Sequence, residues 1–301
     1  MKSTFLGHAG YMLQSGREMI AVDPWLYSSS IEKPLIQGLL PSQTTVDFQM
    51  RETLTGLERF KPRAVLISHF HTHHSPLREI LHFAEVNEHS ELQVFTPPLS
   101  LDDFKAVQRN LGDLSTRIRV IPLERSGEVF TIENFKIRGY FHTQMDHVAW
   151  FVEDQSSSFF HLCDSSANRH RLDSRLDPVW FYYEGLKPSF AAITVGSHMM
   201  KLQMGARRWI AENTTFSPAQ GARLVQLLNP KAVTCMGIGN TSHWTGRVEV
   251  SLPLHVAHDL FQWAVEYLSP TTRYIRQQVG DELDLSLIEP RTVYEDPKGT
   301  T

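Results

Sequence analysis

The chain has 301 residues, of which 41% are hydrophobic and 21% are charged, and its formal net charge at neutral pH is −4. This is the composition of an ordinary globular protein with a large core. The small negative charge argues against a nucleic-acid-binding protein, and no window reaches the ~18 apolar residues of a membrane span or has the apolar core of a signal peptide. Two cysteines exclude a disulfide framework, and we expect a cytoplasmic protein. From the charge and the absence of a long apolar window we expect neither a nucleic-acid nor a membrane partner.

Short apolar runs bounded by turn residues open the chain and predict strands, and segments with helical spacing follow between further strands. The first half alternates strands and helices, the middle is a series of short strands, and helices return in the last third. No linker or internal repeat divides the sequence, so we predict one domain over 1–301 with a polar tail from about residue 290. The predicted strands are 3–6, 11–14, 19–22, 64–67, 92–95, 117–121, 129–132, 135–141, 147–152, 158–163 and 190–195, and the predicted helices include 46–60, 76–86 and 102–111.

Histidines gather directly after the fourth predicted strand. His69, His71, His73 and His74 lie within six positions, and Pro76 follows at a position that favours the start of a helix. Only 15 of the 301 residues are histidine, so this density is not a matter of composition. Imidazole is the commonest transition-metal ligand, and a loop at the end of a strand can direct several rings to one point. A surface histidine tract is the alternative, but such a tract has no strand before it and no helix after it.

The strand–His-x-His-x-x-His–helix arrangement resembles the metallo-β-lactamase superfamily, whose signature is His-x-His-x-Asp-His. His73 stands where the signature has Asp. The resemblance extends from about residue 5 to residue 236 and implies an α/β fold, the four-layer αββα sandwich. Gly7-His8-Ala9 and Val22-Asp23-Pro24-Trp25-Leu26 are similar to the opening of the branch that includes the N-acylphosphatidylethanolamine phospholipase. His8 and Asp23 are therefore either groups that orient metal ligands or a core histidine and a turn cap.

The resemblance also implies ligands at the ends of later strands. His142 would complete the shell of a first metal, Asp164 would bridge two metals, and the second metal would face the last two histidines of the cluster. In the phospholipase-like branch a final histidine follows the strand at 232–236, but Gly237 stands there in this chain. His243 or His198 could replace it, with Asp146 and Glu184 as acidic alternatives. The implied metal ligands are His69, His71, His73, His74, His142, Asp164 and His243.

The two departures, at His73 and Gly237, change the shell of the second metal and place ordinary hydrolysis in question. They resemble the altered motifs of the non-haem diiron monooxygenases on this fold, the chloramphenicol-pathway and platensimycin/platencin-pathway hydroxylases. That resemblance implies two iron ions, an electron donor and hydroxylation of a hydrophobic small molecule, such as one tethered to CoA or to a carrier protein.

Two alternatives stay open: a dinuclear zinc hydrolase of an ester, lactone, amide or phosphodiester, and a non-catalytic metal-binding member of the fold. An aromatic and Met-rich block at 179–183, continued by Met199, Met200, Met204 and Trp209, either lines a substrate pocket or packs in the core.

Overall fold

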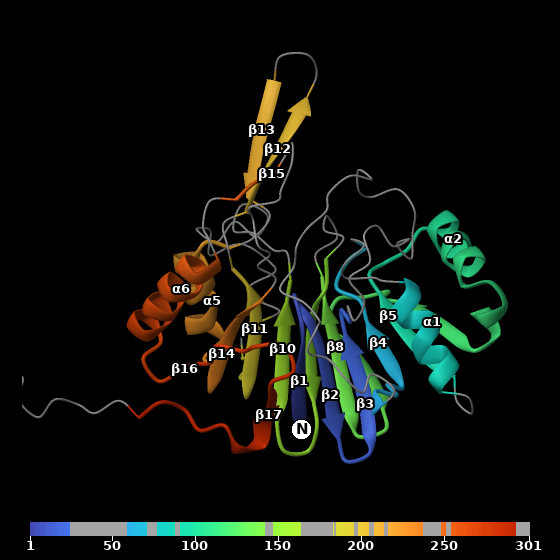
Figure 1. Ribbon diagram of the computed structural model, residues 1–301, viewed down its shortest axis with the longest axis horizontal. Coiled ribbons are helices and arrows are strands. Elements are labelled where there is room, and N and C mark those ends of the chain that lie inside the picture. Colours follow the sequence, from blue (N-terminus) through green and yellow to red (C-terminus); the bar gives the residue numbers. More distant parts are fainter. Residues whose placement is uncertain are drawn as a thin grey trace, which may run out of the picture.

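Two seven-stranded sheets face each other, and helices cover the outer face of each (Figure 1). This four-layer αββα arrangement confirms the predicted fold class. The computed structural model describes residues 1–24, 59–70, 77–87, 91–141, 147–163, 183, 185–195, 216–236 and 256–292 with their side chains, and the backbone of 198–204, 208–213, 248–250 and 254–255.

The first sheet has the strand order β17-β1-β2-β3-β4-β5-β6. Strands β1, β2 and β3 form an antiparallel meander, whereas β3 to β6 run parallel to one another. Both faces of a parallel strand are covered, which is why β4 is a run of three buried apolar residues. The elements of this half are β1 (Lys2–Gly7), β2 (Gly10–Ser15), β3 (Glu18–Val22), β4 (Ala64–Leu66), α1 (Leu77–Val86), β5 (Leu92–Thr96), α2 (Leu101–Leu111), β6 (Ile118–Pro122) and β17 (Glu282–Asp284).

The second sheet has the order β16-β14-β11-β10-β9-β8-β7. Strands β7 to β10 are antiparallel, and β10, β11, β14 and β16 are parallel. Ser217 and Gln220 form a capping box that starts α5, and Asn229 ends this helix in a left-handed conformation. The elements are β7 (Glu128–Ile132), β8 (Phe135–Tyr140), β9 (Ala149–Glu153), β10 (Ser158–Leu162), β11 (Phe190–Thr194), α5 (Pro218–Leu228), β14 (Ala232–Met236), α6 (Leu254–Leu268) and β16 (Arg273–Tyr274).

Three apolar cores hold these layers together. The central core lies between the sheets and contains Tyr11, Trp150 and Phe159, all fully buried. The other two lie between each sheet and its helices. Gly139 belongs to the central contact, because a Cβ at this position would lie 2.5 Å from Leu123 Cδ1 and 2.8 Å from Trp150 Cζ3. The glycine therefore sets how closely β8 approaches its neighbours.

A third, smaller sheet projects beyond the sandwich (Figure 1). It consists of β13 (Arg208–Asn213), β12 (His198–Met204) and β15 (Val248–Val250), all antiparallel. The aromatic and Met-rich block was expected to line a pocket or to pack in the core. The structure places the backbone of Met199, Met200, Met204 and Trp209 in this projecting sheet, and residues 179–182 lie outside the described ranges. The alternation of apolar and polar residues over 200–204 is the strand signal that predicts it.

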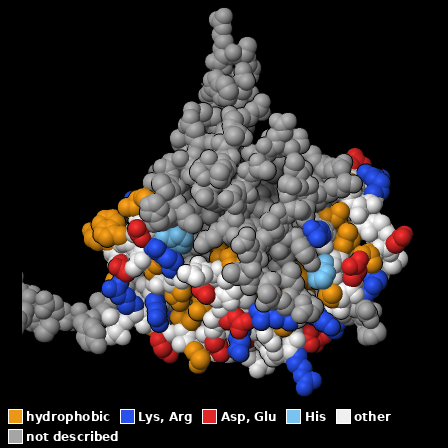
Figure 2. All heavy atoms as spheres, in the orientation of Figure 1, with side chains coloured by type: hydrophobic (Ala, Val, Ile, Leu, Met, Phe, Trp, Pro, Cys, Tyr) orange, Lys and Arg blue, Asp and Glu red, His pale blue; other side chains and the backbone are white. Residues whose placement is uncertain are grey.

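The other predicted strands coincide with observed ones to within one or two residues, as do the helices at 76–86 and 102–111. The predicted helix at 46–60 lies almost wholly outside the described residues, as does most of the polar tail. No described helix is long and apolar enough to cross a membrane. Hydrophobic side chains gather on the outer face of α6 (Figure 2), where Leu260, Trp263 and Tyr267 are exposed.

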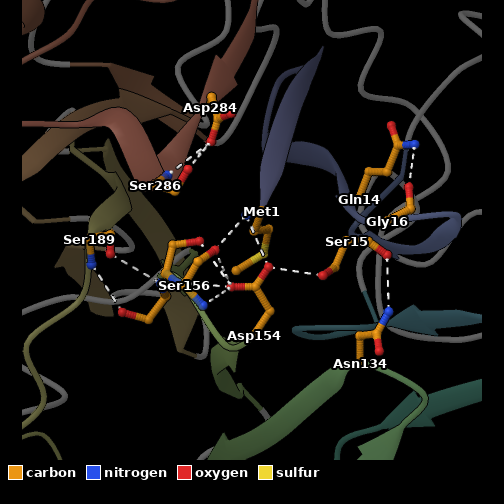
Figure 3. A network of polar contacts seen from close by, with 12 residues as sticks. Met1, Gln14, Ser15, Gly16, Asn134, Asp154, Ser156, Ser189, Asp284 and Ser286 are labelled. Carbon is orange, nitrogen blue, oxygen red and sulfur yellow. Dashed lines mark hydrogen bonds and ion pairs between the residues drawn. The ribbon is translucent and has the colours of Figure 1, made fainter.

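The amino edge of the sandwich is tied by a charged network (Figure 3). The α-ammonium of Met1 lies 3.0 Å from Asp154 Oδ2, and Ser15 Oγ donates to the same oxygen at 2.9 Å. Asp154 Oδ1 accepts from the backbone nitrogens of Ser156 and Ser157 at 2.9 and 2.8 Å. Because Met1 directly precedes β1, Ser15 ends β2 and Asp154 follows β9, the network joins the two sheets at this edge.

Candidate metal centre

The opposite, carboxyl edge of the sandwich carries the candidate site, and it begins where β3 and β4 end side by side. These parallel strands pair Val22 with Leu66, and the backbone nitrogen of Asp23 donates to the Leu66 carbonyl at 2.9 Å. Parallel strands place the residues that follow them at one edge of the sheet. Asp23 and Ser68 are therefore neighbours although 45 positions separate them in the sequence.

Asp23 is bonded twice to Ser68. Asp23 Oδ1 accepts the Ser68 backbone N–H at 2.7 Å, and Asp23 Oδ2 makes a short hydrogen bond with the Ser68 hydroxyl. The same hydroxyl lies 2.9 Å from Nδ1 of His69, the first histidine of the cluster. All three side chains are buried, with exposed fractions of 1% or less. A buried carboxylate is thus linked through one hydroxyl to an imidazole.

The second sheet meets this point at the start of β9. The backbone nitrogen of Val148 donates to the Ser68 carbonyl at 2.8 Å. The ring of His147 stacks on that of His69, with centroids 4.3 Å apart and planes 23° apart. Since β9 is antiparallel to β8 and β10, its first residues lie at the carboxyl ends of those two strands. The carboxyl edges of both sheets therefore converge on Ser68 and His69.

His161 brings β10 to the same place. Its Nε2 lies 2.9 Å from the carbonyl oxygen of Ala9 and 4.0 Å from Asp23 Oδ2, and the residue is fully buried. A carbonyl only accepts, so Nε2 of His161 carries a hydrogen. His161 lies on the strand that leads to Asp164, and its contact with Ala9 joins β10 to the turn after β1.

Two residues at this edge have left-handed backbones. His8, in the turn between β1 and β2, has φ +51°, and Asp23, after β3, has φ +41°. Asp and His are among the few non-glycine residues that adopt this conformation at modest cost. Of the two alternatives for Asp23, the structure shows a carboxylate bonded to the residue that precedes the histidine cluster. His8 is buried in the turn beside it.

Among the predicted ligands, the structure describes only His69. It lies at the convergence of the two sheets, and its role as a metal ligand stays a prediction. Within the described ranges, no group of three or more His, Cys, Asp or Glu side chains forms a cluster able to hold a metal. His198 lies in β12, where only the backbone is described. His71, His73, His74, His142, Asp164 and His243, and the alternatives Asp146 and Glu184, lie outside the described residues.

Three contact residues were not assigned a role by sequence reasoning: Ser68, His147 and His161. The sequence could have predicted the role of Ser68, because a polar residue between a buried strand and a candidate metal-binding histidine is well placed to contact the imidazole ring. His147 lies just before β9 and His161 lies within the apolar strand β10. Only the pairing of the sheets shows that His147 stacks on His69 and that His161 approaches Asp23.

Comparison with solved structures shows that the chain has the metallo-β-lactamase fold. No protein-family model matches the sequence, and no curated protein matches it either.

Among the similar structures is the metallo-β-lactamase fold protein YhfI from Bacillus subtilis, with a TM-score of 0.58 at 14% identity over 94% of this chain and 98% of that one. Igni18, a metallo hydrolase from the archaeon Ignicoccus hospitalis, gives 0.56 at 15% identity, covering 94% and 97%. CmlA, a diiron β-hydroxylase from Streptomyces venezuelae, gives 0.59 at 16% identity, covering 94% of this chain and 53% of its own length.

Proposed function

We propose that this protein is a metal-dependent enzyme whose ions are held at the carboxyl edge of the sandwich, beside His69. The observation that carries the proposal is the buried Asp23–Ser68–His69 chain of contacts. Ligating histidines are typically held through their second ring nitrogen by a carboxylate, a carbonyl or an ordered polar group. Nδ1 of His69 is engaged by Ser68, so we propose that the ring binds a metal through Nε2. The described residues thus fit a transition-metal site.

The class of reaction that we propose is hydroxylation of a hydrophobic small molecule, with two iron ions as the cofactor. Two sequence features support it: His73 in place of the signature Asp, and Gly237 in place of the last histidine ligand. The shared fold with CmlA is consistent with it, because that protein is a diiron hydroxylase. Iron pairs supply the redox change that activation of dioxygen needs, whereas zinc has none. Hydroxylation also requires an external electron donor. As substrate we propose a hydrophobic acid tethered to CoA or to a carrier protein.

The residues of the chain itself supply positioning and exclusion of water. Asp23 holds Ser68, Ser68 and His147 contact the ring of His69, and His161 ties β10 to the same edge. Since all five side chains are buried, the inner side of the site is closed to solvent.

A zinc hydrolase is the second candidate, and the likeness to Igni18 favours it, since that protein is described as a metallo hydrolase. Metal content separates the two. In protein purified from iron-supplemented cells, we expect about two irons per chain and the Mössbauer spectrum of a spin-coupled pair. Zinc in the same stoichiometry, with hydrolysis of a phosphodiester or thioester, would replace the oxygenase proposal.

Substitution of predicted ligands tests the site itself. We expect His71→Ala and His142→Ala each to lose metal and activity. His82→Ala is the matched control, because His82 lies in the middle of α1. Full metal occupancy in either of the first two variants would remove that residue from the ligand set, and loss of metal in all three would point to general destabilisation.

A further inference from the structure

We infer that Ser68 and His147 are positioning residues that set the tautomer and the plane of the His69 ring before any metal binds. The inference rests on the proposed metal site and deepens it, because it assigns this chain a specific device for preorganising one ligand. Ser68 acts through its hydrogen bond to His69, and His147 acts through its ring stack on His69.

The tautomer follows from counting hydrogens. The hydroxyl of Ser68 has one hydrogen, and an ionised carboxylate can only accept. Its short contact with Asp23 Oδ2 therefore uses that hydrogen. The 2.9 Å contact between Ser68 Oγ and His69 Nδ1 must then have the imidazole as donor. His69 is thereby held as the Nδ1–H tautomer, with the lone pair on Nε2.

Asp23 is well placed to keep the Ser68 hydroxyl in this orientation. Its other oxygen accepts the Ser68 backbone N–H at 2.7 Å, and its own backbone nitrogen is bonded to Leu66 at the end of β4. The carboxylate is thus fixed to the same short segment that carries the serine. Rotation of the hydroxyl toward His69 as a donor would leave Asp23 Oδ2 without this hydrogen bond in a buried setting, which is costly.

The plane of the ring is set by His147. A hydrogen bond at Nδ1 does not by itself fix the plane of the imidazole, but a ring stacked at 4.3 Å and 23° restricts its tilt. His147 is itself fixed by the strand pairing next to it, where Val148 bonds to the Ser68 carbonyl. The direction of the Nε2 lone pair is therefore determined by both sheets together. This positioning requires only a stacked ring at position 147, so phenylalanine can replace His147.

The test uses metal affinity, a spectrum and the metal-free protein. Co²⁺ affinity is measured by competition with a coloured chelator, and the visible spectrum of bound Co²⁺ reports ligand geometry. We expect Ser68→Ala to weaken Co²⁺ binding by about 10- to 100-fold, the range found when groups that contact a ligand are removed. Ser68→Thr, which keeps the hydroxyl, should restore most of the affinity and the wild-type spectrum.

Ser189→Ala is the matched control for Ser68→Ala. Ser189 is also buried, and it exchanges hydrogen bonds with Ser158 at 3.1 and 3.0 Å at the amino end of β11, on the edge away from the site. It should cost comparable stability and leave Co²⁺ affinity unchanged within about twofold. For the second residue, His147→Phe should retain affinity because the stack is kept, whereas His147→Ala should lose it and alter the Co²⁺ spectrum.

The proton is observed directly by long-range ¹H–¹⁵N correlation spectra of the metal-free wild-type protein, with His69 assigned from a His69→Gln variant. We expect the hydrogen on Nδ1 in the wild type and a mixture of tautomers in Ser68→Ala. A hydrogen on Nε2 in the wild type, or equal Co²⁺ affinity in Ser68→Ala and Ser189→Ala, would overturn the role of Ser68. Loss of metal in His147→Phe would make His147 a ligand and overturn its positioning role. A wild type that binds no metal refutes the proposed function, while the tautomer is still decided by the metal-free spectra.

Discussion

Replacing Asp154 by Asn tests the network that joins the two sheets at their amino edge. Both residues of this ion pair are largely buried: the side chains of Met1 and Asp154 are 0% and 5% exposed, and Met1 as a whole is 7% exposed. In the variant, Oδ1 can still accept from Ser156 and Ser157. The amide that replaces Oδ2 presents a donor to the ammonium of Met1, so the charge-assisted contact is lost and a buried ammonium is left without its counterion. Removing one partner of a buried pair costs roughly 3–5 kcal/mol.

We expect Asp154→Asn to lower the free energy of unfolding by about 3 kcal/mol, the lower end of this range, because Ser156 Oγ also lies 3.3 Å from the Met1 nitrogen. Urea unfolding followed by circular dichroism measures it as a lower midpoint at an unchanged slope. Asp259→Asn is the control. That carboxylate pairs with Arg276 at 2.5 Å, but the two side chains are 65% and 48% exposed, so we expect a loss below about 0.5 kcal/mol.

The pH dependence gives a second measure of the same pair. Burial opposes ionisation of Asp154, but hydrogen bonds from Ser156, the α-ammonium, Ser15 and Ser157 outweigh it and hold the pKa of this carboxyl well below its usual range. The folded state therefore binds the proton less readily than the unfolded state. The stabilisation that the ionised Asp154 gives is complete above the ordinary carboxyl pKa of ~4, and it is lost as the pH falls below that value. Equal losses for Asp154→Asn and Asp259→Asn, or a difference between wild type and Asp154→Asn that does not shrink in acid, would refute the reasoning.

Two further predictions concern packing and titration. Gly139→Ala should lower the free energy of unfolding by about 1–3 kcal/mol, because the new methyl group would overlap Leu123 and Trp150; an unchanged urea midpoint would show that β8 and β9 can separate without cost. Burial lowers the pKa of His258 to about 4, with a further lowering by Arg276 and an opposing effect of Asp259. Folding therefore favours the neutral ring, and the free energy of unfolding should fall as the pH drops from about 6.5 to 4. His258→Gln, which can still accept from Tyr274, should flatten this decline by on the order of 3 kcal/mol, and an equally steep acid decline in the variant would exclude His258 as its source.

Sequence patterns predicted the sandwich because its strands are short, apolar and separated by clear turns. The Ala64–Leu66 strand followed by histidines could be recognised because the side chains change from apolar to polar between Ile67 and His69. The contacts around Asp23 could not be predicted in this way. They depend on the pairing of β3 with β4 and on the bond from Val148 to Ser68, which bring together residues 45 and 80 positions apart. The projecting sheet was missed because methionine was interpreted as core or pocket material, although its alternation with Lys201 and Gln203 is typical of a strand.

The left-handed backbone at Asp23 has a practical consequence for anyone who engineers this protein. Glycine would relax the backbone at that residue, so a design guided by dihedral angles alone would choose it. The same exchange would remove the carboxylate that orients the serine hydroxyl beneath the first histidine. It would also leave the backbone N–H and the hydroxyl of Ser68 without their buried acceptor, so we expect the glycine variant to be less stable than the wild type despite its relaxed backbone.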